Sequence, residues 1–294
     1  MPEGKIIKAL SGFYYVLDQD QIIQCRGRGV FRKNKITPLV GDTVVYQAEN
    51  NREGYIMEVK ERINELIRPP IANVDQAILI FSAKEPDFSS TLLDRFLVII
   101  ESNDINPIIC LTKLDLLTDE EKIHLMNFVN DYEKIGYQII LSSSKTKEGI
   151  NELLPYLDEK ISVFAGQSGV GKSSLLNAIN PELALKTSHI SSHLGRGKHT
   201  TRHVELIEIN NSGLVADTPG FSALEFDELE AENLSNCFPE MAQRSSECKF
   251  RGCLHVNEPK CAIKNALENN EIADYRYHHY LQFLQEIRER KPRY

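Results

Sequence analysis

An eight-residue stretch, residues 166–173, restricts the possible folds of this chain more than any other part of it. It fits the pattern G-x-x-x-x-G-K-[ST] at every fixed position, and it lies between the apolar run Ile161–Ala165 and a helical pattern over Lys172–Ile179. Glycines in such a loop let backbone N–H groups turn toward a phosphate, and the N-terminus of the following helix adds partial positive charge. The sequence therefore predicts a strand, a phosphate-binding loop and a helix in succession.

Two side chains of this loop have predicted roles in binding a triphosphate. Lys172 is expected to reach the β- and γ-phosphates, and Ser173 is expected to ligate Mg²⁺. A glycine- and serine-rich turn that fits the pattern by chance is the alternative, which the flanking strand and helix disfavour. The residues predicted to bind the nucleotide here are Gly166, Gln167, Ser168, Gly169, Val170, Gly171, Lys172, Ser173 and Ser174.

Two upstream loops predict that the base is guanine. Residues 112–115 follow an apolar run and fit the [NT]-K-x-D motif of Ras-like GTPases, whose aspartate accepts hydrogen bonds from guanine N1–H and the exocyclic amine. Adenine offers no such donor pair, so the aspartate selects the base. Residues 142–145 resemble the T-S-A-K loop, which places a backbone N–H at guanine O6; each motif alone could be an ordinary surface loop. The predicted base-binding residues are Thr112, Lys113, Asp115, Ser143, Ser144 and Lys145.

Two downstream segments are expected to respond to the γ-phosphate. In the D-x-x-G element that begins at Asp217, the carboxylate is expected to hold the Mg²⁺ shell through water and the Gly220 N–H to meet the γ-phosphate. The Gly- and Thr-rich segment 195–203 is expected to be a switch, which supplies Thr201 or Thr200 as a second Mg²⁺ ligand; the sequence leaves that choice open. The expected catalytic residues are His199, Lys172, Thr200, Thr201 and Gly220.

The residue after the D-x-x-G element bears on hydrolysis. Phe221 stands where Ras-like proteins carry the glutamine that orients the attacking water, and a phenyl ring cannot do so. Slow intrinsic hydrolysis is therefore expected unless a partner or another group acts. His199 is the candidate for orienting water, and a solvated loop histidine is the alternative.

The order of these motifs is permuted, because the guanine motifs precede the phosphate loop instead of following it. The termini of compact domains often lie close together, so a permuted chain can build the same sheet. In this order the D-x-x-G element leads directly into the C-terminal region. A moving switch is then expected to pull on residues beyond 221.

A cluster near the C-terminus predicts a metal site. The spacing C-x4-C-x-H-x5-C supplies three thiolates and one imidazole, which is the ligand set of a closed structural Zn²⁺ site. Buried unpaired cysteines are the alternative. The predicted ligands of one zinc ion per chain are Cys248, Cys253, His255 and Cys261.

The N-terminal residues read as short β-strands of an OB-fold barrel. The net charge of −8 argues against a generally basic nucleic-acid binder, but residues 26–33 form a basic, glycine-bearing stretch expected to be an RNA-binding loop. Nearby aromatics could stack on bases or fill the barrel instead: Phe13, Tyr14, Tyr15 and Phe31. Pro69 and Pro70 are expected to stop regular structure and to mark a boundary.

The expected fold class is a multi-domain α/β protein. It comprises an OB-fold RNA-binding domain over 1–67, a permuted P-loop GTPase domain over 73–221 and a mostly helical zinc-binding domain over 222–294. The central sheet is expected to be mostly parallel with helices on both faces, and one long helix is expected over 262–290. The sequence shows neither an apolar run of about 18 residues nor a signal-peptide pattern, so we expect a cytoplasmic protein without a membrane segment.

Taken together, these motifs resemble the circularly permuted, ribosome-small-subunit-dependent GTPases of bacteria over nearly the whole chain. The family commonly has Asn at the position of Thr112. The resemblance implies a late-acting assembly factor of the small ribosomal subunit. It would bind ribosomal RNA in its GTP state, and the subunit would stimulate hydrolysis and release. We expect a monomer; an RNA-binding GTP/GDP sensor with little turnover is the main alternative, and a GTP-gated RNA-modifying enzyme is disfavoured because no second catalytic constellation appears.

Overall fold

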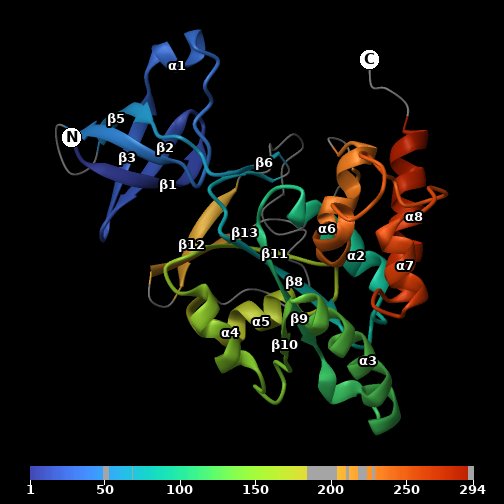
Figure 1. The fold of residues 1–294 in the computed structure, drawn as a ribbon. Coiled ribbons are helices and arrows are strands. Elements are labelled where there is room, and N and C mark those ends of the chain that lie inside the picture. The colour runs from blue at the N-terminus through green and yellow to red at the C-terminus, as the bar shows by residue number, and fades with distance from the viewer. Residues whose placement is uncertain are drawn as a thin grey trace.

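The computed structural model describes residues 1–48, 53–67, 69–183, 204–209, 212–217, 224–226 and 229–290 (Figure 1). An N-terminal β-barrel lies at one side of the molecule, a central sheet with flanking helices lies in the middle, and the C-terminal helices pack at the other side (Figure 1). Among the described residues, no helix is long and apolar enough to cross a bilayer.

The N-terminal unit is a five-stranded barrel with the strand order of an OB-fold. The order is β1-β2-β3-β5-β4, β4 pairs back onto β1 and closes the barrel, and β3 runs parallel to β5. Alternate side chains such as Ile6, Val16 and Ile56 are fully buried inside it. The strands are β1 (Glu3–Leu10), β2 (Phe13–Asp18), β3 (Gln21–Gly27), β4 (Thr43–Ala48) and β5 (Glu53–Val59).

Two expectations for this unit were wrong in detail. The basic stretch is not a loop, because Arg26 and Gly27 end β3 and the short helix α1 (Gly29–Lys33) follows. Phe31 is only 6% exposed, so burial of its ring in the barrel core favours the helix and removes it as a stacking surface. Pro70 begins β7 (Pro70–Ala72), which pairs with β6 (Glu65–Ile67); proline is tolerated as the first residue of such a strand.

The central sheet is mostly parallel, as expected, with the order β10-β9-β8-β11-β13-β12. Only β12 runs antiparallel within this part, against β13. Every residue of β8 and β11 is buried, which explains their unbroken apolar sequences. The strands are β8 (Gln76–Ser82), β9 (Asn106–Thr112), β10 (Gln138–Leu141), β11 (Ile161–Ala165), β12 (Glu205–Ile209) and β13 (Gly213–Asp217).

Helices cover both faces of this sheet. Leu79 of β8 points into a core shared with α2 (Ser90–Glu101) and α3 (Asp119–Ile135). The next residue, Ile80, points into the opposite core with α4 (Ile150–Leu157) and α5 (Lys172–Ile179). Because strand side chains alternate between faces, the sheet is doubly wound. The sequence pattern did not predict α4, which is short and contains Pro155.

The barrel and the central sheet are hydrogen-bonded to each other. Strand β1 pairs with β12 at Lys8 and Glu205, whose side chains also form a 2.9 Å ion pair, so eleven strands form one continuous sheet. This pairing joins the barrel to the strand that follows the expected switch segment.

The C-terminal unit is helical, as expected, but the single helix expected over 262–290 is two. Helix α7 (Ala262–Glu268) ends near Asn270, whose φ is +58°, and α8 (Asp274–Glu289) follows. A residue in the left-handed region closes the helix, and the amide of Glu271 donates to the Ala266 carbonyl at 2.9 Å. The remaining helical elements are a 3-10 helix (Ala231–Cys237) and α6 (Pro239–Ser245).

Candidate nucleotide site and metal centre

The phosphate loop joins β11 to α5 at the carboxyl edge of the central sheet. Its glycines adopt conformations that other residues rarely take, with φ of +150° at Gly166, +82° at Gly169 and +96° at Gly171. A Cβ atom on Gly166 would lie 2.1 Å from the carbonyl oxygen of Ile80 on the neighbouring strand. Close packing against β8 therefore requires glycine at the start of the loop.

Lys172 lies over this loop. Its Nζ donates to the carbonyl oxygens of Gly166 at 2.7 Å and Gln167 at 2.5 Å. Burial lowers the pKa of Lys172 to about 8, because desolvation disfavours the charged ammonium. Ser173, the next residue, is 9% exposed at the first turn of α5. The arrangement places an ammonium donor and a hydroxyl at the mouth of the loop.

The two guanine-type loops meet at the same edge of the sheet. They follow the adjacent parallel strands β9 and β10. The Ser143 hydroxyl donates to the Asp115 carboxylate at 2.6 Å, and Lys145 Nζ lies 3.8 Å from the other carboxylate oxygen. Ser143 is 1% exposed and also accepts from the Thr146 amide at 3.2 Å. This buried hydroxyl orients the Asp115 carboxylate.

Thr112 joins the guanine loops to the phosphate loop. Its hydroxyl donates to the Val170 carbonyl at 2.5 Å and lies 3.3 Å from the Phe81 carbonyl, and its side chain is buried. The sequence motif predicted a base contact for Thr112 and did not reveal this bridge. Lys113, with φ of +59°, hydrogen-bonds through Nζ to the Glu85 carbonyl.

Several predicted site residues fall outside the part of the chain that the structure describes. Asp217 ends β13 beside β11, which places its backbone at the same edge as the phosphate loop. Its side chain is not described. The residues beyond the described ranges are His199, Thr200, Thr201, Gly220 and Phe221.

The cysteine and histidine cluster forms a compact donor set. The Sγ atoms of Cys248, Cys253 and Cys261 and a ring nitrogen of His255 all lie within 4.8 Å of one another. Cys248 Sγ is 3.9 Å from Cys261 Sγ, while His255 Nδ1 is 3.6 Å and 3.3 Å from these two sulfurs. Tetrahedral coordination at Zn–S of about 2.3 Å places two sulfurs about 3.8 Å apart, so these donors fit a metal ion of that size.

The loop that carries these donors is held from two sides. The Glu258 carboxylate accepts from the amides of Leu254 and Val256 at 2.8 Å each. The Tyr277 hydroxyl of α8 donates to the His255 carbonyl at 2.6 Å. The ligand spacing did not reveal these supporting residues, although Glu258 lies within the same segment.

A buried ionic network, which sequence reasoning missed, attaches the C-terminal helices to the GTPase unit. Arg276 of α8 is 1% exposed and donates to Asp94 of α2 at 2.5 Å and to Glu240 of α6 at 2.8 Å. The other Asp94 oxygen lies 2.6 Å from His279 Nδ1. The residues of this ionic network lie far apart in the sequence, so no local pattern could have predicted the network.

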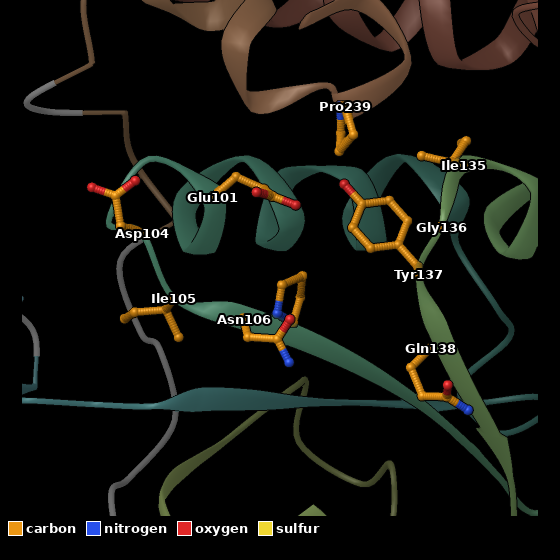
Figure 2. A pocket seen from close by; sticks show the side chains of 10 residues that line it. Glu101, Asp104, Ile105, Asn106, Ile135, Gly136, Tyr137, Gln138 and Pro239 are labelled. Atoms are coloured by element: carbon orange, nitrogen blue, oxygen red, sulfur yellow. The ribbon is translucent and has the colours of Figure 1, made fainter. Parts of the chain in front are cut away.

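A cavity of about 450 Å³ lies away from these loops, at the amino edge of the sheet (Figure 2). Asn106 and Gln138 begin β9 and β10 there, and Glu101, Tyr137 and Pro239 complete much of the wall (Figure 2). The predicted nucleotide and metal residues do not line it. It is therefore not the nucleotide site.

A phosphate loop and preceding guanine loops on one edge of a parallel sheet define a circularly permuted GTPase. Comparison with known families agrees: residues 59–227 match the RsgA GTPase model, and residues 3–56 match the RsgA N-terminal domain model. The chain belongs to the RsgA GTPase family and is a GTPase.

Full-length relatives and solved structures resemble the chain closely. Proteins named small ribosomal subunit biogenesis GTPase RsgA from Bacillus pumilus and Bacillus subtilis are 67% and 64% identical, with complete coverage of both chains. The crystal structure of YloQ, a circularly permuted GTPase, is 60% identical, with a TM-score of 0.87 over 100% of this chain and 97% of that one. YjeQ from Thermotoga maritima is 38% identical, with a TM-score of 0.89 over 99% of each chain.

Proposed function

We propose that this GTPase is an assembly factor of the small ribosomal subunit. The subunit stimulates GTP hydrolysis by the factor. The nucleotide part of the proposal depends on one observation: the buried Thr112 hydroxyl ties the guanine loops to the Val170 carbonyl of the phosphate loop. This contact supports recognition of the base and the phosphates at one edge of the sheet. The ribosomal part rests on the names of the full-length relatives.

The proposed roles of the site residues follow the motifs. Asp115 and Lys113 bind guanine, Ser143 orients the Asp115 carboxylate, and Lys172 exchanges its loop carbonyls for the β- and γ-phosphates. Ser173 and a switch threonine, Thr201 or Thr200, would hold Mg²⁺, which offsets phosphate charge when bound. The remaining proposed roles are water orientation by His199, support of the Mg²⁺ shell by Asp217 and a γ-phosphate contact by the Gly220 amide.

The flanking units complete the proposal. The barrel, within the proposed domain 1–67, binds ribosomal RNA through its basic stretch, and Arg26 lies 4.9 Å above the Phe13 ring there. The helical domain, proposed over 222–294, holds one structural zinc ion, and the GTPase domain spans 73–221. We propose a cytoplasmic monomer.

The test measures GTP hydrolysis by the full chain with purified small subunits and, separately, with purified large subunits. Small subunits should raise the turnover rate strongly, and large subunits should change it little. His199→Ala should slow stimulated hydrolysis and leave nucleotide affinity near normal. Equal rates with and without small subunits would favour a nucleotide sensor instead.

A further inference from the structure

The cavity at the amino edge of the central sheet has an acidic wall. Glu101 and Asp104 line it at the end of α2, and no lysine, arginine or histidine is among the described residues that line it. Glu101 is half-buried, and Asp104 is exposed. The other polar side chains of the wall include the neutral amides of Asn106 and Gln138. The wall therefore carries negative charge that none of its own side chains neutralises.

Glu101 is the least favourably placed of these acids. Burial raises its pKa above the ordinary value, because desolvation disfavours the charged carboxylate. Arg276 attracts this carboxylate, whereas Glu240 and Asp104 repel it. The Arg276 guanidinium already forms ion pairs with Asp94 and Glu240. A further cation beside Glu101 would therefore stabilise its charged form.

Two helices end at the same cavity. Glu101 is the last residue of α2, Ile135 is the last residue of α3, and both line the wall. The C-terminus of a helix carries partial negative charge and stabilises a cation placed near it. The backbone therefore adds to the negative potential that the two carboxylates create.

A buried hydroxyl in the wall lacks a partner. Tyr137 is 7% exposed, and its hydroxyl oxygen has no hydrogen-bond partner of normal geometry among the described residues. Figure 2 shows this hydroxyl directed toward the neighbouring Glu101 carboxylate, below Pro239. Buried polar groups are nearly always paired, so a ligand that donates a hydrogen bond here would satisfy the oxygen. The hydroxyl and the carboxylates together favour a ligand that carries positive charge and N–H donors.

We propose that this cavity binds a small organic cation, an amine or a guanidinium compound, whose charged group donates to the Glu101 carboxylate and to the Tyr137 hydroxyl oxygen. A volume of about 450 Å³ suits a whole small molecule. A calcium ion fits less well, because it takes about six to eight oxygen ligands and the described wall has only two carboxylates. Because Pro239 begins α6, the ligand would contact both the GTPase unit and the C-terminal unit. The inference goes beyond the proposed function and does not depend on it.

The test measures binding of putrescine, a linear diamine, and of agmatine, which carries a guanidinium, to the full chain by isothermal titration calorimetry. The matched ligand control is butanediol, which has the same carbon chain as putrescine with hydroxyls in place of the ammonium groups. Both cations should bind, and butanediol should not.

Three substitutions locate the binding. Glu101→Gln should weaken putrescine binding by roughly 10- to 100-fold, because it removes the half-buried charge and keeps the side-chain shape. Tyr137→Phe should weaken it by about three- to tenfold, since only the hydroxyl is lost. Asp104→Asn should weaken it by roughly twofold, because this carboxylate is exposed, and asparagine tolerates the local φ of +53°.

The matched protein control is Glu120→Gln, which removes the same charge from an exposed position of α3 that does not line the cavity. Its affinity for putrescine should stay within about twofold of that of the unmodified chain. Equal losses in Glu120→Gln and Glu101→Gln would show that the cations follow only the net charge, and this overturns the proposal. It is also overturned if neither cation binds, or if Glu101→Gln and Tyr137→Phe both bind normally. If Glu101→Gln does not fold, unchanged affinity in Tyr137→Phe overturns it.

Discussion

Individual side chains at the carboxyl edge of the central sheet are hydrogen-bonded to other groups of the protein. Lys172 donates to two carbonyls of its own loop, and the Asp115 carboxylate accepts from a buried serine. The Ser143 contact holds the Asp115 carboxylate in place and so reduces the ordering that a ligand must otherwise impose, whereas Lys172 must exchange its loop carbonyls for the phosphates. Nucleotide affinity should therefore depend on the charge of the Lys172 ammonium and on the acceptor oxygens of Asp115.

The affinity for a non-hydrolysable GTP analogue should depend on pH through Lys172. The pKa of this group is about 8 in the described structure, and bound phosphates favour its charged form and raise the pKa again. Below pH 8 the ammonium is charged in both states, so affinity should be flat. Above pH 8 binding must take up a proton, so affinity should fall by up to about tenfold per pH unit.

Fluorescence titrations between pH 6.5 and 9 measure this dependence. Lys172→Arg is the matched control. Its guanidinium stays charged over this pH range, so its deprotonation cannot lower the affinity above pH 8. Identical pH profiles for the two proteins would contradict the assignment of Lys172 to the phosphates.

Base selection should reverse with one substitution. In Asp115→Asn an amide donor replaces a carboxylate acceptor, while an amide oxygen can still accept from Ser143. Affinity for GDP should fall by roughly 100-fold or more, and affinity for xanthosine diphosphate should rise, since its second carbonyl can accept from the new amide. Competition binding measures both, and unchanged GDP affinity would place guanine elsewhere.

At the scale of elements, the local sequence pattern predicted the bounds of some helices and strands and missed those of others. The predicted bounds of β11 and α5 match the structure, because one is an apolar run and the other a helical pattern, each with clear breaks. The break between α7 and α8 and the helix at residues 29–33 were missed. Burial of Phe31 favours the helix at 29–33, whereas Asn270 in the left-handed region ends α7 before α8 begins.

The Cys3His cluster could hold a metal ion, and we propose that the local fold depends on the bound zinc. Cys261→Ser should reduce the zinc content of the purified protein from about one ion per chain to near zero, and it should increase protease cleavage within the C-terminal helices, since structural zinc supplies folding energy. Cys237→Ser is the matched control, because Cys237 is buried in the same unit but lies outside the donor set. Unchanged zinc content in Cys261→Ser would refute this ligand set.

At the scale of the whole molecule, specific contacts join the barrel, the central sheet and the C-terminal helices. The permuted order led to the expectation that a moving switch would pull on residues beyond 221. That expectation stays a prediction, because the switch segment lies outside the described residues. Within them, Arg95 of α2 donates to the Leu224 carbonyl at 2.9 Å, and Arg276 of α8 donates to Asp94 of α2. We expect the C-terminal helices to move with α2, and the barrel to respond through the β1–β12 pairing.

The buried network should dominate the stability of this assembly. Asp94→Ala leaves the Arg276 guanidinium buried with fewer partners, so it should lower the free energy of unfolding by about 3–5 kcal/mol. Glu205→Ala removes an ion pair that also joins two units, but its side chains are 32% and 46% exposed, so the change should be about 0–1 kcal/mol. Urea unfolding measures both, and equal effects would contradict the argument.

The sequence by itself determined the phosphate-loop and guanine-type motifs, their permuted order and the four candidate metal donors, because each is a short pattern of residue types whose chemistry demands that spacing. The tertiary structure alone decided what couples them: the Thr112 bridge, the Asp94–Arg276 network, the Arg95 contacts and the joining of barrel and sheet at β1 and β12. These contacts link residues far apart in the chain, and the Thr112 and Asp94–Arg276 contacts among them are strengthened by burial. A local stretch of sequence specifies neither which distant residues pair nor how deeply they are buried.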